Sequence, residues 1–363
     1  MTGRTGDRPV VLFAGHRFDI CPDVTFRSYQ SDHVQAFVPH TAPAPPCGHL
    51  TQIRVRHSQD LFRRRMARLA DAPSLPVVPF RGEPYRFSRI GDVSWWRPQP
   101  GSHLPQDHLY AMDGIGWLHV LIHPGTHRGE RYLMRIIRES VLRCAETRGW
   151  AAFHAAATAV EGQGVLIAGP SGAGKTTVAT ALATHYGADL IASDRAVVTD
   201  QAAMVVGVPL SVRIGAGTLG ALPPHHRLTR FRAPLGNSGH AHKASYTPRT
   251  FAHAFAARVR ESAPLRVAVI PQLSDDAQDV TVSVLGPDAA RAALTAACCT
   301  PDDEDWLHPW FADRTRPVHV IRDQAAQLVD DLVQRVPVVN VRAGVRSPHL
   351  LERLADTVTR RLT

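Results

Sequence analysis

A nine-residue stretch, GPSGAGKTT from Gly169 to Thr177, has the residue types and spacing needed to bind phosphate groups. It fits the pattern GxxxxGK[ST] of a phosphate-binding loop at every position. Glycines let successive backbone N–H groups curl around phosphate oxygens, and the helix that follows adds the partial positive charge of its N-terminus. Lys175 is expected to reach the β- and γ-phosphates of a nucleotide, and the Thr176 hydroxyl to bind Mg²⁺. The residues expected to contact the nucleotide are Gly169, Pro170, Ser171, Gly172, Ala173, Gly174, Lys175, Thr176 and Thr177.

The choice of lysine inside this stretch supports the same interpretation. Lys175 is one of only two lysines in a chain with 39 arginines. An arginine guanidinium is broad and planar, whereas a crowded loop needs a compact charge on a flexible stem. A sequence with so strong a bias toward arginine is expected to keep lysine where the exchange is not tolerated.

Two residues outside the loop could act on a substrate held there. Asp194 lies 19 residues after Lys175, at the end of the apolar run in ADLIASDR. Because ligands of open α/β sheets bind at the carboxyl ends of strands, Asp194 is expected to face the phosphates. A carboxylate there can hold Mg²⁺ or accept the proton of an attacking hydroxyl. His154 lies 21 residues before Lys175 and is either a site residue or a buried core histidine.

At these residues the chain resembles the C-terminal catalytic domain of the HPr kinase/phosphorylase family and its peptide-serine and small-molecule kinase relatives. The resemblance rests on FHAAATAVEGQGVLIAGPSGAGKTT followed by LIASDRAVV, and it covers about residues 150 to 290. It implies a P-loop core of the phosphoenolpyruvate-carboxykinase-like type and ATP- and Mg²⁺-dependent phosphorylation of a hydroxyl. It also gives Asp194 the general-base position, Lys175 the phosphate position, Thr176 and Asp194 the metal position, and His154 the place of the site histidine.

The chain departs from this family in two respects. Ser193 stands where the family has the first of two aspartates, so one candidate metal contact is weaker. The sequence also holds no convincing copy of the glycine-rich element, or of the metal-binding glutamate, associated with the phosphorylase reaction. These departures favour a kinase that works in one direction.

Other cations are candidates for contact with substrate. The second lysine, Lys243, lies in APLGNSGHAHKASYTP (233–248), a glycine- and histidine-rich stretch that is expected to be a loop. Such loops often close over substrates, so Lys243 is either a phosphate or substrate ligand or an exposed loop residue. Phosphoryl transfer also requires a cation near the migrating group. The candidates are Arg213, Arg258, Arg260 and Arg266, and the sequence does not choose among them.

The elements around these residues predict an α/β fold with two domains. Strand, glycine loop, helix and strand follow one another from GVLIA to DLIA, with further strands expected at 204–214, 265–273, 278–286 and 336–344 and helices at 129–149 and 347–361. This alternation predicts a layered α/β catalytic domain over 126–363. Residues 1–125 contain short apolar runs separated by proline, glycine and aspartate, which predict a β-rich domain with a helix near 58–70 that helps to bind the acceptor. We expect one of the adjacent Trp95 and Trp96 to be buried and the other partly exposed.

Composition narrows the function classes. Hydrophobic residues make up 44% and charged residues 20%, as in soluble globular proteins, and neither a membrane-spanning run nor a signal peptide is evident, so a cytoplasmic location is expected. The net charge of +9 would attract anions, but the arginines are scattered, so nucleic acid is not an expected partner. The five cysteines lack the spacing of a disulfide framework or a zinc site.

The expected function is therefore that of an ATP- and Mg²⁺-dependent kinase. It would transfer the γ-phosphoryl group to a hydroxyl of a peptide or protein serine, or of a small metabolite, in a biosynthetic or tailoring pathway. The alternative is a P-loop ATPase or nucleotide-dependent switch with no phosphorylated acceptor, and a third is a nucleotide-binding module without catalysis. The expected partners are a nucleoside triphosphate and the acceptor, and assembly into a homo-oligomer is left open.

Overall fold

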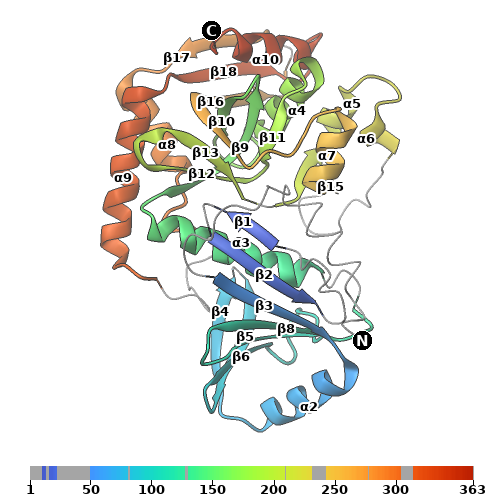
Figure 1. Ribbon diagram of the computed structural model, residues 1–363. Helices are drawn as coiled ribbons and strands as arrows, with labels where there is room; N and C mark the ends of the chain where they lie inside the picture. The colour runs from blue at the N-terminus through green and yellow to red at the C-terminus, as the bar shows by residue number, and fades with distance from the viewer. Residues whose placement is uncertain are drawn as a thin grey trace, which may run out of the picture. The chain divides into compact units, whose positions relative to one another are not determined.

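The computed structural model describes residues 10–13, 16–22, 50–80, 82–126, 130–208, 210–230, 243–276, 278–303 and 314–362. The fold over these residues is mixed α/β, and the chain divides into two compact units (Figure 1). Unit 1 comprises Met1–Gln35, His40–Cys144 and Asp302–Thr315, and unit 2 comprises Ala36–Pro39, Ala145–Pro301 and Arg316–Thr363. Most of helix α3 (Glu130–Thr147) thus belongs to unit 1, whereas the sequence suggested a boundary between residues 125 and 126.

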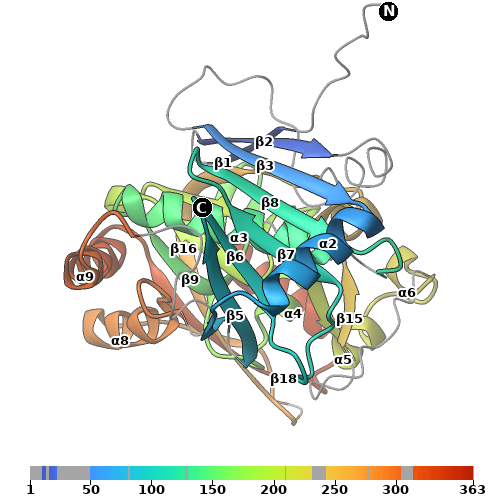
Figure 2. The ribbon, with the colours of Figure 1, turned by 90° about the horizontal axis from the view of Figure 1, so that it is seen from below.

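Unit 1 is built on an eight-stranded mixed sheet. In spatial order its strands are β1 (Val10–Phe13), β2 (His16–Pro22), β3 (Leu50–His57), β8 (Trp117–Ile122), β7 (His108–Met112), β6 (Val93–Pro98), β5 (Glu83–Ile90) and β4 (Leu75–Phe80). Helix α2 (Gln59–Ala70) lies within the predicted helical stretch and begins after Ser58, whose hydroxyl accepts a hydrogen bond from the Leu61 N–H at 3.4 Å. Helix α2 crosses one face of the sheet (Figure 2), and its residues Phe62 and Leu69 share a hydrophobic cluster with residues of β6, β7 and β8.

The two adjacent tryptophans of β6 are both buried, so the expectation of one partly exposed ring is wrong. Their side chains point to opposite faces of the sheet. Trp95 packs in the cluster that contains Phe62 of α2. Trp96 pairs with Tyr110 of β7, on the face whose tyrosine and histidine rings contact Tyr132 of α3. Helices therefore cover both faces, which leaves neither ring in water.

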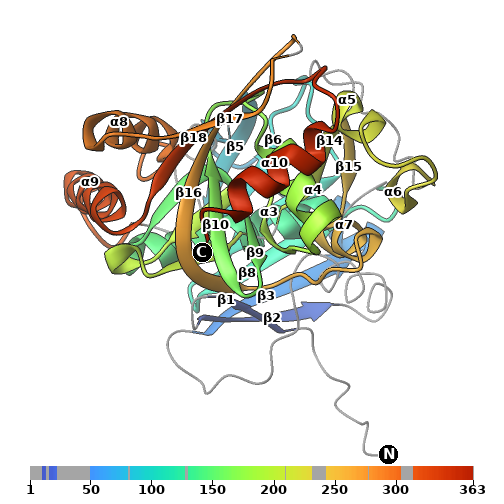
Figure 3. The ribbon, with the colours of Figure 1, turned by 90° about the horizontal axis from the view of Figure 1, so that it is seen from above.

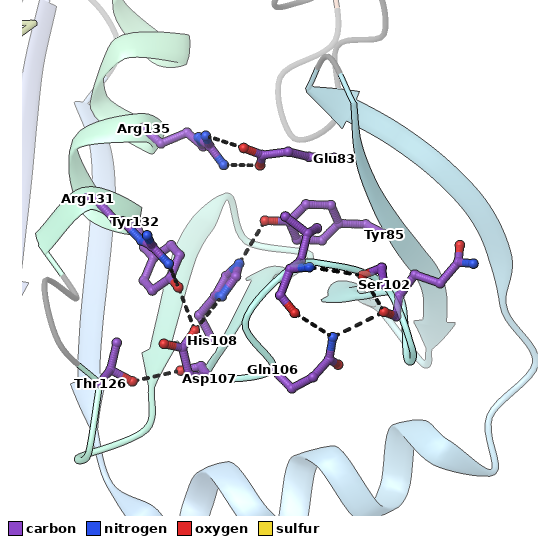
Figure 4. Close-up of polar contacts among 12 residues, drawn as sticks. Glu83, Tyr85, Ser102, Gln106, Asp107, His108, Thr126, Arg131, Tyr132 and Arg135 are labelled. Atoms are coloured by element: carbon purple, nitrogen blue, oxygen red, sulfur yellow. Dashed lines mark hydrogen bonds and ion pairs between the residues drawn. The ribbon is translucent and has the colours of Figure 1, made fainter. Parts of the chain in front are cut away.

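A buried polar network holds α3 against this second face (Figure 4). The His108 ring is 1% exposed and stacks on Tyr132 with 3.7 Å between centroids. It joins the Tyr85 hydroxyl, 2.7 Å from Nε2, to the Asp107 carboxylate, 3.0 Å from Nδ1. Tyr132 donates to the same carboxylate at 2.5 Å and accepts a hydrogen bond from Arg131. Burial lowers the pKa of His108 despite the opposing effect of Asp107, so the ring is neutral in the folded protein.

A second polar contact fixes α3 on the sheet. The Arg135 guanidinium donates two hydrogen bonds to the Glu83 carboxylate of β5, one of them 2.8 Å long. Bidentate charge-assisted pairs have a narrow preferred geometry. The pair therefore sets the position of α3 along the sheet in addition to attracting it.

Unit 2 has three layers around a second sheet. The strand order is β10 (Gln163–Ala168), β9 (Ala151–Val160), β12 (Arg195–Val198), β13 (Met204–Gly207), β16 (Ser262–Ser274), β18 (Val338–Gly344) and β17 (Thr281–Val284), with β11 (Asp189–Ala192) paired to β9 and β10 also paired to β16. Helices α4 (Lys175–Tyr186) and α10 (Leu350–Thr359) share one hydrophobic core with the strands, and α8 (Pro287–Ala297) and α9 (Val318–Arg335) share the other. Figure 3 shows α10 beside α4, and α8 beside α9.

Most elements expected in this region are present, with one difference that matters for the site. The stretch 204–214 was predicted as one strand but forms two, β13 and β14 (Val212–Gly215), in different sheets. β14 pairs with β15 (Lys243–Tyr246) to form a two-stranded ribbon. Of the predicted loop 233–248, residues up to 242 lie outside the described residues and 243–246 are this strand. Three short helices complete the unit: α5 (Ala216–Gly220), α6 (Arg227–Arg230) and α7 (Pro248–Ala254).

Among the residues that the structure describes, no helix has both the length and the apolar character needed to cross a bilayer.

Replacing His108 with phenylalanine tests the network of unit 1. Phenylalanine can stack on Tyr132 but leaves the Tyr85 hydroxyl and the Asp107 carboxylate without this partner. We therefore expect the free energy of unfolding to fall by about 1–3 kcal/mol near neutral pH. Because the folded protein holds His108 neutral, its contribution is full above the pKa of the unfolded chain, about 6.5, and is lost as the pH falls below it.

Urea unfolding followed by tryptophan fluorescence, at about pH 7.5 and about pH 5.5, measures both effects. His103→Gln, at an exposed position of the same unit, is the matched control and should keep the wild-type pH dependence. The same pH dependence in His108→Phe as in the wild type would contradict the neutral, buried assignment.

Candidate functional site

The glycine-rich loop connects β10 to α4, in the order that the sequence predicts. Gly169, Gly172 and Gly174 have φ angles of +150°, +85° and +106°, which residues other than glycine rarely adopt. Helix α4 begins at Lys175, directly after the loop. The first N–H groups of a helix have no intrahelical acceptor, so the loop ends at a place that favours anions.

The side chain of Lys175 extends from the start of α4 back toward the beginning of the loop. Its side-chain ammonium donates hydrogen bonds to the carbonyl oxygens of Gly169 at 2.8 Å and Pro170 at 2.9 Å. The residue is only 7% exposed. The two carbonyls satisfy two of the three donors of the ammonium group, which leaves one donor for an anion at the loop.

The electrostatics of Lys175 identify the charged residues around it. Burial lowers the pKa of Lys175 to about 8, the Asp194 carboxylate opposes this shift, and the positive charges of Arg195 and Lys243 add to it. The Cys299 thiol acts in the same direction as Asp194. The only two lysines of the chain are thus within electrostatic reach of each other, and the predicted catalytic aspartate is within reach of the loop lysine.

Three neighbouring strands bring His154 and Asp194 to the loop. At one edge of β9, the His154 carbonyl accepts a hydrogen bond from the Gly169 N–H at 3.3 Å. At the other edge, the Ala155 N–H donates to the Asp194 carbonyl at 3.2 Å, where the chain passes from β11 to β12. The His154 imidazole Nε2 then lies 3.4 Å from Asp194 Oδ1, and both side chains are about one-third exposed or less. The predicted trio of Lys175, His154 and Asp194 is therefore gathered in one place.

Asp194 is held in its ionised form. Burial alone would raise the pKa of this carboxyl, but a hydrogen bond with His154 and the charges of Arg195, His154 and Arg213 outweigh burial and hold the pKa well below its usual range. The Arg195 guanidinium donates to Asp194 Oδ2 at 3.0 Å and to the Asp194 carbonyl at 3.1 Å, and its side chain is 6% exposed. The site thus contains a fixed negative charge with a buried cation behind it.

Sequence reasoning missed two residues of this site. Arg195 is the first residue of the otherwise apolar and buried strand RAVV. A lone charged residue in such a strand could have indicated that it pairs with an opposite charge. Cys299 comes from a segment that pairs with β9 just beyond the loop, where its N–H donates to the Ala152 carbonyl at 2.8 Å. No local pattern marks Cys299, because the pairing joins segments about 150 residues apart.

Ser193, at the position of the missing aspartate, has a structural role. Its hydroxyl donates to the carbonyl oxygens of Leu210 at 3.3 Å and Ser211 at 3.0 Å, and the residue is 8% exposed. It thereby ties the segment before β14 to the turn that carries Asp194.

The threonines of the loop differ in their surroundings. Thr176 is half-buried in the first turn of α4, the position from which a hydroxyl could join a metal shell. The Thr177 hydroxyl lies 2.8 Å from the Thr218 hydroxyl of α5, so it links two helices. Ser171, at the tip of the loop, is exposed.

Two of the four candidate arginines lie away from Asp194. The Arg258 N–H donates to Asp189 Oδ1 at 2.9 Å, and the Arg260 guanidinium donates to Asp189 Oδ2 at 2.9 and 3.1 Å. Asp189 opens β11, whereas Asp194 follows the end of the same strand. Arg258 and Arg260 therefore belong to the opposite end of β11.

The remaining two candidates are exposed, and only one is near the site. Arg266 lies on β16 next to the first residues of β10, at the end of β10 that is remote from the loop. Arg213 of β14 contributes to the lowered pKa of Asp194. Lys243 of β15 acts on Lys175 in the same way, so the ribbon brings a cation to each of the two site residues.

The two predicted metal ligands, Thr176 and Asp194, both offer oxygen atoms. In the part of the chain that the structure describes, no three His, Cys, Asp or Glu side chains are grouped so that they could hold a metal ion. Mg²⁺ commonly binds through one or two protein oxygens, with water and substrate phosphates completing its shell. The predicted ligands Thr176 and Asp194 would supply one hydroxyl and one carboxylate of that kind.

Substitution of Gly174 tests the close approach that shapes the loop. A Cβ at Gly174 would lie 2.4 Å from the Leu273 side chain, at a φ of +106°. Gly174→Ala should therefore lower the free energy of unfolding by the strain of the backbone and by about 1–3 kcal/mol of overpacking. In Gly172→Ala the φ is also positive, but a Cβ meets nothing within 4 Å, so this control isolates the backbone strain. Equal losses in urea unfolding would contradict the contact.

Comparison with known proteins adds no relative. No model of a known protein family matches the chain, and no curated protein matches it.

Proposed function

We propose that this protein is a phosphotransferase that uses ATP and Mg²⁺ to phosphorylate a hydroxyl group. The observation that carries the proposal is an ionised Asp194 within electrostatic reach of Lys175. Lys175 is the first residue of α4, directly after a loop with the sequence of a phosphate-binding loop. The proposal places a P-loop core of the HPr kinase type in unit 2. The resemblance of residues 150 to 290 to that family supports the assignment.

The loop and Lys175 account for the nucleotide side of the reaction. Backbone N–H groups of residues 169–176 would surround the β-phosphate, and the N-terminus of α4 would add favourable charge. Lys175 would contact a phosphate oxygen where the β- and γ-phosphates meet, with the one donor that is not bound to the loop carbonyls. Mg²⁺, when bound through Thr176 and Asp194, would supply positive charge to the departing phosphate.

Asp194 accounts for the acceptor side. A carboxylate with so low a pKa is a weak base, so its main task is to orient the acceptor hydroxyl by accepting a hydrogen bond. This suits phosphoryl transfer, because its loose transition state requires little removal of the proton before the phosphorus–oxygen bond forms. His154, 3.4 Å from the carboxylate, would keep the carboxylate in position. The acceptor itself would be a serine of a peptide or protein, or a hydroxylated metabolite.

Substitution of Asp194 and Lys175 tests this assignment. Asp194→Asn replaces the charged oxygen that orients the acceptor hydroxyl with a neutral amide, and it should slow transfer by about 10²- to 10⁴-fold. Lys175→Ala removes the positive charge that would contact the phosphates, and it should slow transfer by about 10²- to 10³-fold. Mass spectrometry of serine-containing peptides and hydroxylated metabolites, incubated with ATP, Mg²⁺ and protein, detects the gain of one phosphoryl group.

Asp189→Asn is the matched control. Asp189 is also a carboxylate with an arginine partner, but it lies at the first residue of β11, whereas Asp194 follows the last. This variant should retain wild-type transfer. Free phosphate without a phosphorylated acceptor would favour the ATPase alternative, and near-normal transfer by Asp194→Asn would remove this residue from the reaction.

The pKa of Lys175 predicts how nucleotide binding depends on pH. Phosphate binding requires the ammonium form, and in the free protein the pKa of Lys175 is about 8. Affinity should therefore be constant below about pH 8 and fall as the pH rises above it, by up to about tenfold per pH unit. The phosphate groups are already fully ionised in this range, since their last pKa is about 6.

Calorimetric titration with ADP between about pH 7 and pH 9.5 measures this dependence. Lys175→Met should bind more weakly and lose the transition near pH 8. A transition that persists in this variant would show that another group is responsible.

A further inference from the structure

The β14–β15 ribbon presents an apolar face and a cationic face. Its strands are antiparallel, with Arg213 opposite Ser245 and Gly215 opposite Lys243. Along β14 and β15, the buried residues are Val212, Ile214, Ala244 and Tyr246, which join the core that contains α4. The alternate residues Arg213 and Lys243 are exposed, and the register puts them diagonally across the same face.

Hydrogen bonds attach the ribbon to both halves of the site. Before β14, the carbonyls of Leu210 and Ser211 accept hydrogen bonds from Ser193, the residue next to Asp194. After β14, Thr218 of α5 bonds to Thr177 in the first turn of α4. β14 therefore runs from the turn that carries Asp194 to the helix that carries the loop lysine. Arg213, which is exposed on this short strand, is close enough to Asp194 for its charge to lower the pKa of that carboxyl.

Cationic side chains gather at this site. Lys175, Arg195, Arg213 and Lys243 act on one another or on the Asp194 carboxylate. Arg195 already pairs with Asp194. Repulsion among the remaining cations is relieved when an anion binds near them. The amides of the loop and Lys175 can serve the β-phosphate, so the ribbon cations lie where a further oxyanion would be favoured.

We propose that Arg213 and Lys243 form a second anion site that binds the terminal phosphoryl group of a nucleoside triphosphate, so that the ribbon distinguishes a triphosphate from a diphosphate. The inference rests on the proposed function, in which the loop holds the inner phosphates. The planar guanidinium of Arg213 can contact two phosphoryl oxygens at once, and Lys243 adds a point charge. Once the phosphoryl group has moved to the acceptor, the diphosphate no longer contacts the ribbon and is bound more weakly.

The experiment compares two nucleotides on four proteins. Calorimetric titration with Mg²⁺ and either ADP or an ATP analogue with an imido bridge between the β and γ phosphorus atoms gives the dissociation constants of the wild type, Arg213→Gln, Lys243→Gln and Arg266→Gln. For each ribbon variant we expect the triphosphate analogue to bind at least about tenfold more weakly, the loss expected for one charge-assisted hydrogen bond. ADP binding should change by less than about twofold, and Arg266→Gln should leave both constants unchanged.

Each result decides a separate point. Equal weakening of ADP and the analogue, or no weakening of either, in the ribbon variants would overturn the inference, while ADP binding by the wild type would leave the nucleotide site of the proposed function standing. If the wild type binds neither nucleotide, the proposed function fails together with the inference. Both ribbon residues are exposed, and circular dichroism of each variant verifies that it is folded.

Discussion

The electrostatic attraction between Asp194 and Lys175 is the interaction on which the rest of the site depends. Lys175 is buried in a loop that gives its charge two carbonyl oxygens, and Asp194 is the carboxylate that offsets the surrounding cations. The sheet enforces this proximity through main-chain hydrogen bonds, because β9 is bonded to Gly169 at one edge and to Asp194 at the other. The backbone of the loop and that of Asp194 are therefore held on either side of β9.

The two units use buried charge in different ways. In unit 1, His108, Asp107 and Tyr132 satisfy one another and fasten a helix to a sheet, so the polar groups serve the fold. In unit 2, Lys175, Arg195 and the ribbon cations Arg213 and Lys243 act on one another or on the single carboxylate of Asp194. Satisfied networks favour a single rigid packing, whereas an excess of one charge favours a ligand. This contrast is the physical reason for placing the chemistry in unit 2.

Local patterns in the sequence predicted the parts of the site that are close in the chain. The glycine spacing around Lys175 and the apolar run before Asp194 each indicate a strand end, and the mixed α/β fold follows from the alternation of elements. The pairing of β14 with β15 could not be predicted, because its backbone hydrogen bonds join residues that are at least 28 positions apart. For the same reason the sequence did not choose Arg213 among four arginines or bring Cys299 beside β9. The pair Trp95 and Trp96 was misjudged, because the burial of each ring depends on whether a helix covers its face of the sheet.

A crystal structure with Mg²⁺ and a non-hydrolysable ATP analogue would show whether the loop and Asp194 act on one nucleotide. We expect the β-phosphate to lie in the loop of residues 169–174, with the Lys175 ammonium in hydrogen-bond contact with a phosphate oxygen. We also expect the Asp194 carboxylate to face the γ-phosphorus with room for one hydroxyl between them, within hydrogen-bond reach of about 2.6–3.2 Å from that hydroxyl. A nucleotide bound elsewhere, or one bound in the loop with Asp194 turned away from its terminal phosphate, would rule out this arrangement.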